Sequence, residues 1–479
     1  MTKQDQPNII FIITDQQRHD TIKALGHDHM ITPNLDRMVE EGVAFTRMYC
    51  TSPVCSPSRA SLFSGLYPHS SGVLRNDERW PYTWVHLLAE AGYRCVNVGK
   101  MHTHPFEEPF GFHERHVTEN KDRAHPALPF YLDNWDKALW ASGHTKPSRQ
   151  TYCHRADYKD RLGAFVWELP EKLHPDVFVA QSAVHWLESY KGEEPFFLQV
   201  GIPGPHPPYD PTAEALALYD GVAFPQPIRN YDLDSQPTAM RRLRQNHIAN
   251  DHDAVVHLAD PTPEQMQRQR AHYAANVTMI DEQLGHLKAA LEARGVLDDT
   301  VIIFTSDHGD SLNDHGHSQK WSMFESSVRV PCVMHDPRRQ DGGRRIDDLT
   351  SLFDLGPTIL ELAGVAPPAW MEARSLVPYF DRDTDPARDT VYAELADDMI
   401  QEDCPFVTMI RTGKWKLVHY LGSSEGQLFD LEADPDEVEN LWDAPAHQAT
   451  RQELTHRILE WRLQSARRTQ KFLVEGLTS

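Results

Sequence analysis

The run Ile9-Ile10-Phe11-Ile12-Ile13-Thr14 is followed directly by the polar pair Asp15-Gln16. An uninterrupted run of apolar and β-branched residues is typical of a strand that is buried on both faces of a sheet. Similar runs occupy residues 94–98, 195–201, 300–305 and 328–334, and they alternate with helix-like segments at residues 31–42, 58–65, 83–92, 176–191, 262–295 and 351–364. This alternation predicts an α/β fold with a mostly parallel sheet that is covered by helices on both faces.

The pattern changes near residue 390. Four short strand-like runs at residues 390–394, 406–411, 415–420 and 427–430 precede a helical segment at residues 451–466. We therefore expect a catalytic domain over residues 1–388 and a small C-terminal α+β subdomain over residues 389–479. Residues 100–175 and 203–260 are weakly periodic, and long loops of this kind usually build or cover a site.

Composition and charge exclude several classes of protein. Hydrophobic residues make up 40% and charged residues 24% of the 479 residues, which excludes a disordered, collagen-like or coiled-coil chain. A net charge of −23 argues against nucleic acid or an anionic membrane as a partner. We find no transmembrane or signal segment, and the six scattered cysteines form neither a disulfide framework nor a zinc motif, so we expect a cytoplasmic protein.

The segment Cys55-Ser56-Pro57-Ser58-Arg59 opens a predicted helix that ends at Gly65. Ser56 is a suitable N-cap, and Pro57 suits the first helical position. Cys55 would then lie just outside a helix N-terminus, where backbone N–H groups favour an anion, with Arg59 beside it.

Polar residues also follow two of the predicted strands: Asp15 and Gln16 follow the first, and Asp307 and His308 follow the strand at residues 300–305. Sites in open α/β sheets form beyond the carboxyl ends of strands, so the two pairs can converge. Three oxygen donors and one imidazole suit a single divalent cation. An isolated Asp is more often a cap or turn residue, so the prediction depends on this convergence.

The Cys-x-Pro-Ser-Arg element, followed by Gly65-Leu66-Tyr67-Pro68, resembles the signature of the type I sulfatases of the alkaline phosphatase superfamily. Residues 7–15, 305–309 and 427–441 resemble the family's first strand, its late strand-end motif and its C-terminal subdomain. Gln16 and His308 point to the arylsulfatase, choline sulfatase and phosphonate monoester hydrolase subgroup, because many other sulfatases have Asp and Asn there. The resemblance implies an alkaline phosphatase-like fold with a large mixed sheet, and hydrolysis of a sulfuric ester.

The resemblance also implies the cofactors and the roles of individual residues. A formylglycine-generating enzyme would oxidise Cys55, and one divalent cation would bind, Ca²⁺ by family analogy, with Mn²⁺ left open by His308. A hydrated formylglycine has two hydroxyls, one to attack sulfur and one to lose a proton so that the carbonyl re-forms and expels sulfate. The implied catalytic residues are Cys55, Arg59, Lys100, His102, His206 and Lys320; the implied substrate contact is Asn76; and the implied metal ligands are Asp15, Gln16, Cys55, Asp307 and His308.

Two alternatives remain open at this point. Residues 459–469 resemble the tail of phosphonate monoester hydrolases, so hydrolysis of a phosphonate monoester or phosphodiester is the first alternative. Those enzymes have Tyr and Thr where this chain has Lys100 and His102, which favours a sulfate ester. The second is a non-catalytic protein that binds sulfate esters, in which Cys55 stays a thiol. We also expect a homo-oligomer, a dimer or tetramer, because the resembling subfamilies use C-terminal tails in subunit contacts.

Overall fold

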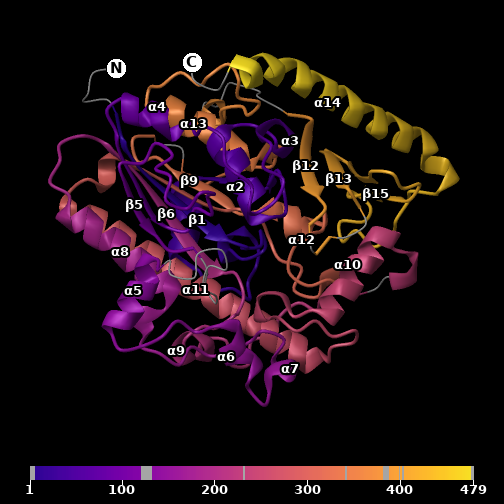
Figure 1. The fold of residues 1–479 in the computed structure, drawn as a ribbon, viewed down its shortest axis with the longest axis horizontal. Helices are drawn as coiled ribbons and strands as arrows, with labels where there is room; N and C mark the ends of the chain where they lie inside the picture. The colour runs from indigo at the N-terminus through magenta and orange to yellow at the C-terminus, as the bar shows by residue number, and fades with distance from the viewer. Residues whose placement is uncertain are drawn as a thin grey trace.

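The computed structural model describes residues 6–119, 132–229, 232–339, 342–380, 388–398, 400–401 and 404–475. Among these residues, a mixed eight-stranded sheet forms the centre of the molecule (Figure 1). Its strands lie in the order β10 (Arg344–Ile346), β2 (Val43–Phe45), β9 (Cys332–His335), β7 (Thr300–Ser306), β1 (Asn8–Asp15), β6 (Phe196–Pro205), β4 (Arg94–Gly99) and β5 (Glu114–Val117). Only β9 runs antiparallel to its neighbours, which confirms the mostly parallel sheet.

Strand β1 shows why helices cover both faces of this sheet. Its side chains alternate in direction, so Ile10 and Ile12 enter one hydrophobic cluster while Phe11 and Ile13 enter another. The first cluster is closed by helices α1 (Pro33–Glu41), α8 (Pro175–Ser189) and α11 (Pro263–Arg294). The second is closed by α2 (Cys55–Ser64), α4 (Val85–Glu90) and α13 (Leu355–Leu362). Helices therefore cover both faces of the sheet, and the carboxyl ends of the neighbouring central strands β1 and β7 lie side by side where these strands end.

The C-terminal part contains a second, antiparallel sheet, as predicted. Strands β12 (Thr390–Ala396), β13 (Phe406–Thr412), β14 (Trp415–Tyr420) and β15 (Gly426–Asp430) form a meander, and helix α14 (Gln448–Glu475) lies across it (Figure 1). Helix α14 is anchored by Trp461, whose ring stacks on Tyr392 with centroids 4.2 Å apart. The boundary at residue 388 stays a prediction, because Val391 of β12 shares a hydrophobic cluster with Phe11 of β1.

The structure differs from the prediction at residues 328–334. This run is split at Pro331 into β8 (Arg329–Val330), which joins a small sheet with β3 (Met48–Tyr49) and β11 (Thr350–Ser351), and β9, which joins the large sheet. Proline has no N–H to donate to a ladder, so a continuous strand cannot pass through it undisturbed.

The weakly periodic stretches hold short helices, and β6 extends further than predicted. The remaining helices are α3 (Pro68–Ser71), α5 (Asn134–Ala141), α6 (Arg149–Cys153), α7 (Tyr158–Arg161), α9 (Ala213–Ala217), α10 (Thr238–Ala249) and α12 (Glu325–Val328).

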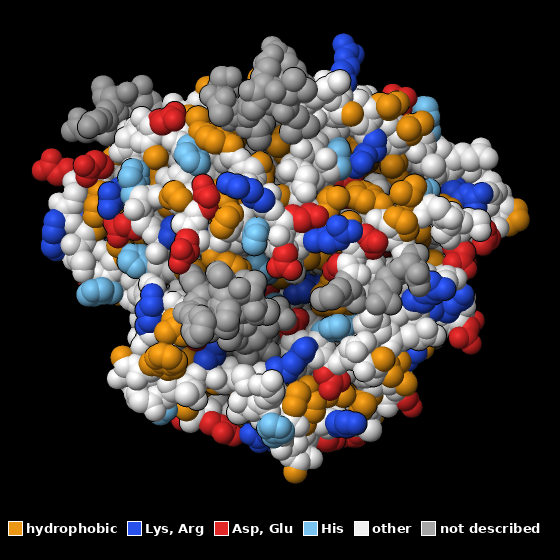
Figure 2. Space-filling model, viewed as in Figure 1, with side chains coloured by type: hydrophobic (Ala, Val, Ile, Leu, Met, Phe, Trp, Pro, Cys, Tyr) orange, Lys and Arg blue, Asp and Glu red, His pale blue; other side chains and the backbone are white. Residues whose placement is uncertain are grey.

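Within the part of the chain that the structure describes, no helix combines the length and apolarity needed to cross a membrane. On the face shown in Figure 2, acidic and basic side chains are interspersed over the surface.

Candidate active site

Helix α2 brings Cys55 into the interior. The helix begins at Cys55 itself, with Val54 as the N-cap residue, so the prediction that Ser56 caps the helix is wrong. The hydroxyl of Ser56 is instead held by Trp80, whose Nε1 donates to it at 2.8 Å. The helix ends at Gly65 in the left-handed conformation, as predicted. Cys55 is 1% exposed, so its thiol faces a closed set of neighbours.

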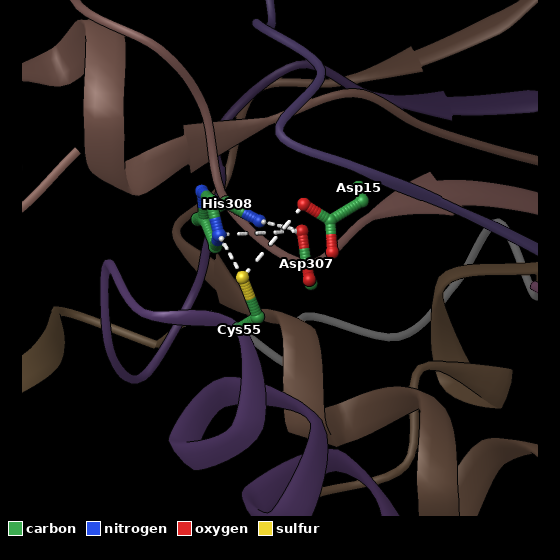
Figure 3. A group of neighbouring side chains, drawn as sticks. All are labelled: Asp15, Cys55, Asp307 and His308. Atoms are coloured by element: carbon green, nitrogen blue, oxygen red, sulfur yellow. Dashed lines mark hydrogen bonds and ion pairs between the residues drawn. The ribbon is translucent and has the colours of Figure 1, made fainter. Parts of the chain in front are cut away.

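Four potential metal ligands surround a common point at the ends of β1 and β7 (Figure 3). These strands are parallel neighbours, with Thr14 opposite Ser306, and Asp15 and Asp307 follow at adjacent positions. One ligand atom each from Asp15, Cys55, Asp307 and His308 lies within 4.8 Å of every other. The predicted convergence of the two strand ends is therefore present in the structure.

The imidazole of His308 is held in one orientation. Its Nδ1 donates to the carbonyl oxygen of Gly309 at 2.9 Å, which leaves Nε2 facing Cys55 Sγ at 3.1 Å. A side chain at Gly309 would place Cβ 2.0 Å from the carbonyl oxygen of Ser326, so this approach requires glycine. Burial lowers the pKa of His308, but the charges of Asp307 and Cys55 outweigh it and raise that pKa.

Gln16 is the fifth predicted ligand, and its amide is also oriented. Its backbone lies in the left-handed region, with φ 69°. Its Nε2 donates to Asp310 Oδ2 at 2.7 Å, so Oε1 turns the other way and accepts from Lys320 Nζ at 3.0 Å. The same ammonium lies 3.3 Å from Cys55 Sγ. Lys320 thus joins the predicted ligand Gln16 to the predicted nucleophile.

Two further cations bind the carboxylates. Arg59 contacts Asp307 Oδ2 through Nε at 2.7 Å and Asp15 Oδ2 through Nη2 at 3.3 Å. Lys100 Nζ lies 2.7 Å from the same oxygen of Asp15. Burial would raise the pKa of Asp15, but these cations hold it well below its usual range. Arg59, Lys100 and Lys320 thus place three buried positive charges around Asp15, Asp307 and Cys55, and buried cations that converge in this way favour an anionic ligand beside them.

Both predicted histidines border this group. His102 follows Lys100 with φ 62°, and its backbone N–H donates to Glu119 Oε2 at 2.9 Å. Burial and the charge of Lys100 lower the pKa of His102 well below its usual value. His206 follows β6, and burial together with Lys320 lowers its pKa to about 3.

Asn76 is placed less centrally than the other predicted residues. It is half-buried, and its Oδ1 accepts from the backbone N–H of Ser56 at 3.1 Å. The structure therefore brings Asn76 to the start of α2 but gives its side chain no contact with the ligand group.

Three acidic residues near the site escape sequence analysis. Asp310 accepts from Gln16 and from the hydroxyl of Tyr209, Glu119 accepts from His102, and Asp253 lies 3.8 Å from His206. Only Asp310 had a sequence signal, its position three residues after Asp307. Glu119 and Asp253 lie in weakly periodic segments, where spacing carries no information about contacts.

Comparison with known proteins agrees with this geometry. A family model described as sulfatase matches residues 7–365, and one described as N-sulphoglucosamine sulphohydrolase, C-terminal, matches residues 313–464. An arylsulfatase of Clostridium perfringens (strain 13 / Type A) is 30% identical over 456 residues, 91% of this chain and 90% of the relative. A choline-sulfatase of Rhizobium meliloti (strain 1021) is 31% identical over 455 residues, 92% of this chain and 83% of the relative.

A solved structure extends the likeness to the fold. The phosphonate monoester hydrolase of Agrobacterium radiobacter superposes with a TM-score of 0.76 at 25% identity, covering 96% of each chain. The chain therefore belongs to the sulfatase family of the alkaline phosphatase superfamily, and so to the sulfuric ester hydrolases.

Proposed function

We propose that the protein hydrolyses a sulfate monoester with a formylglycine made from Cys55 and one divalent cation. The observation that carries the proposal is the convergence of three buried cations, Arg59, Lys100 and Lys320, on the group around Cys55. Buried cations that converge in this way stabilise an anion placed beside them, and a bound metal ion would add to this effect. A sulfate ester supplies the anion.

The residues present fit a divalent cation. Asp15, Gln16, Asp307 and His308 would hold it together with residue 55, because Nδ1 of His308 and Nε2 of Gln16 are bound elsewhere and Nε2 of His308 faces the site; Oε1 of Gln16 would exchange its contact with Lys320 for the ion. We propose Ca²⁺ from the number of oxygen donors, with Mn²⁺ as the alternative that the imidazole allows. When bound, the ion would offset negative charge on the sulfate and lower the pKa of a hydroxyl on residue 55.

The side chains around residue 55 supply the remaining steps. A hydrated formylglycine at residue 55 would supply the nucleophile for sulfur, a hydroxyl that has released its proton at the lowered pKa, and the ester oxygen would leave with the electron pair of its bond to sulfur. Lys100 and Lys320 offset the charge of the sulfate oxygens, and His206 protonates the departing alcohol. His102 would then take the proton of a second hydroxyl on residue 55, so that sulfate could leave with the electrons of its bond to that residue, and water would rehydrate the carbonyl.

Hydrolysis of a phosphonate monoester or phosphodiester is the second candidate function, and the likeness to the Agrobacterium enzyme favours it. We place it second because Lys100 and His102 adjoin the ligand group. Lysine supplies a full charge beside the transferred group, and histidine supplies a base that threonine cannot.

A comparison of substrates tests this order. We expect kcat/KM for an aryl, alkyl or choline sulfate to exceed that for a phenyl phosphonate ester, measured on one preparation with Ca²⁺ and again with Mn²⁺. A preference for the phosphonate would reverse the order of the two functions. Turnover of neither class, together with a residue 55 that is entirely thiol by mass, would favour the non-catalytic binding protein.

Further parts of the proposal concern the cellular setting. A formylglycine-generating enzyme would act on Cys55 before it is buried, since the folded thiol is almost inaccessible. We propose a cytoplasmic location, which is supported by six cysteines that are all unpaired. We also propose a dimer or tetramer, which is supported by the apolar side chains of Leu459 and Leu463 on α14, 54% and 58% exposed.

A further inference from the structure

We propose that Asp253 is a positioning residue for His206: its charge stabilises the protonated imidazole until the proton passes to the departing alcohol. This inference rests on the proposed function, because it takes His206 as the acid of that reaction. Asp253 lies in the 3₁₀ turn His252–Ala254, far from His206 in sequence, and no motif pointed to it.

The contacts of His206 decide which ring nitrogen carries the transferable proton. Nδ1 donates to the carbonyl oxygen of Pro207 at 2.8 Å, so Nε2 is the nitrogen that can exchange a proton with a substrate. Asp253 Oδ2 lies 3.8 Å from this Nε2. That separation is too long for a hydrogen bond but is an ion-pair distance once the ring is protonated, and such contacts often tighten when substrate binds.

The surroundings of His206 make a carboxylate partner necessary. The charges of Lys320 and Lys100 oppose protonation of the ring, and those of Asp15 and Asp253 favour it. Of these two carboxylates, Asp253 has an oxygen 3.8 Å from Nε2 of His206, whereas Asp15 forms ion pairs with Lys100 and Arg59. The side chains of His206 and Asp253 are only 11% and 10% exposed, so solvent screens the pair weakly.

The backbone that carries Asp253 is strained. Asp253 and Ala254 have φ of 53° and 61°, two successive residues other than glycine in the left-handed region. Strain of this kind persists where the surrounding structure imposes it, and it clusters at functional sites. Gln319 contacts this turn, because its Nε2 donates to the carbonyl oxygen of His252 at 2.9 Å, and Gln319 directly precedes Lys320. The turn that presents Asp253 is thus tied to the loop that presents Lys320.

Proton transfer from His206 to the departing alcohol does not require Asp253 to take up a proton. As the bond from sulfur to the ester oxygen breaks, its electron pair goes to that oxygen, which takes the proton from His206 Nε2. The ring is left neutral, and Asp253 keeps its charge throughout. In the His–Asp pair of serine hydrolases the carboxylate binds the ring nitrogen that does not react; Asp253 instead lies beside the reacting Nε2, so it acts through its charge and not through a hydrogen bond.

The test is a series of aryl sulfates whose phenols differ in pKa, from 4-nitrophenyl to phenyl and 4-methoxyphenyl sulfate. Asparagine adopts the left-handed conformation as readily as aspartate, so Asp253→Asn keeps the backbone and removes the charge. We expect kcat/KM to fall about 10- to 100-fold for the poorer leaving groups, since proton transfer contributes at least this much. For 4-nitrophenyl sulfate, which leaves without a proton, we expect less than about a threefold loss, far below the contribution of general acid catalysis.

Two further variants separate the possible results. Asp251→Asn makes the same charge change two residues away and should leave the series unchanged, while His206→Gln should show a dependence at least as steep as Asp253→Asn. The slope of kcat/KM against the pKa of the phenol compares substrates on one preparation, so it does not depend on the fraction of the protein that is folded. A uniform loss in Asp253→Asn, or the same slope in Asp251→Asn, would overturn the positioning role. A flat series in His206→Gln would instead remove the acid from the proposed function.

Discussion

Replacing Lys100 by methionine tests whether a buried charge drives turnover. The ammonium is 3% exposed and lies 2.7 Å from Asp15, and Asp15 keeps Arg59 at 3.3 Å when Lys100 is removed. The carboxylate is therefore not left unpaired, and we expect Lys100→Met to fold. The substitution should instead weaken the interaction with the substrate, because it removes a hydrogen bond to a charged group, and such a bond contributes about 1.5–3 kcal/mol.

This hydrogen-bond free energy can be converted into an expected change in kcat/KM. At 1.36 kcal/mol for each factor of ten, we expect kcat/KM for an aryl sulfate to fall about 10- to 150-fold. Lys288→Met serves as the control, since it removes another ion-paired lysine, 3.4 Å from Glu41, and should leave kcat/KM unchanged. The assay is initial-rate hydrolysis of 4-nitrophenyl sulfate, with thermal unfolding measured on each variant.

The same residue should control the choice of ester. Lys100→Tyr combined with His102→Thr should narrow or invert the ratio of sulfate to phosphonate turnover. A loss below about threefold in Lys100→Met, outside the range expected for a charged hydrogen bond, would refute the reasoning. An equal loss for the phosphonate ester would refute the link between Lys100 and specificity.

Three further predictions concern the nucleophile, the cation and acid stability. Cys55→Ala should abolish turnover and leave the melting temperature near that of the wild type, because Cys55, although buried, begins a helix and lies outside the hydrophobic clusters of the described residues; retained sulfatase activity would exclude a covalent mechanism. Asp307→Ala should slow hydrolysis on the order of a thousandfold or more, and a variant still active in chelator would exclude the proposed cation site. Burial lowers the pKa values of His257, His272 and His315 to about 4. Between pH 6.5 and 4 the unfolded chain then binds more protons than the folded one, so the melting temperature should fall as pH falls; a flat profile there would contradict this.

The sequence predicted the site best where strong local signals coincide. Strand β1 is an uninterrupted apolar run, so its end could be located, and Asp15 could be placed beside Asp307 from the two strand ends alone. The turn from β7 into Asp307 and His308 was predictable for the same reason. Family resemblance, and not spacing, supplied Lys100, His206 and Lys320, because each lies in a loop or at a strand end that local patterns do not define.

Contacts made by tertiary packing could not be predicted. Helix α2 starts at Cys55 and not after Ser56, because Trp80 binds the Ser56 hydroxyl that was predicted to cap the helix. Nothing in the local sequence indicates that Trp80 lies near Ser56. Asp253 meets His206 through a strained turn held by Gln319, and left-handed residues other than glycine have no reliable sequence signal. The site therefore combines residues set by strand ends with residues set by loops, and only the first group follows from periodicity.

The most direct test of the formylglycine mechanism is the mass of the peptide that contains residue 55, measured on preparations of different specific activity. The mechanism predicts that part of the peptide carries the aldehyde in place of the thiol, and that kcat rises in proportion to the aldehyde fraction. Full sulfatase activity from protein whose residue 55 is entirely thiol would contradict it.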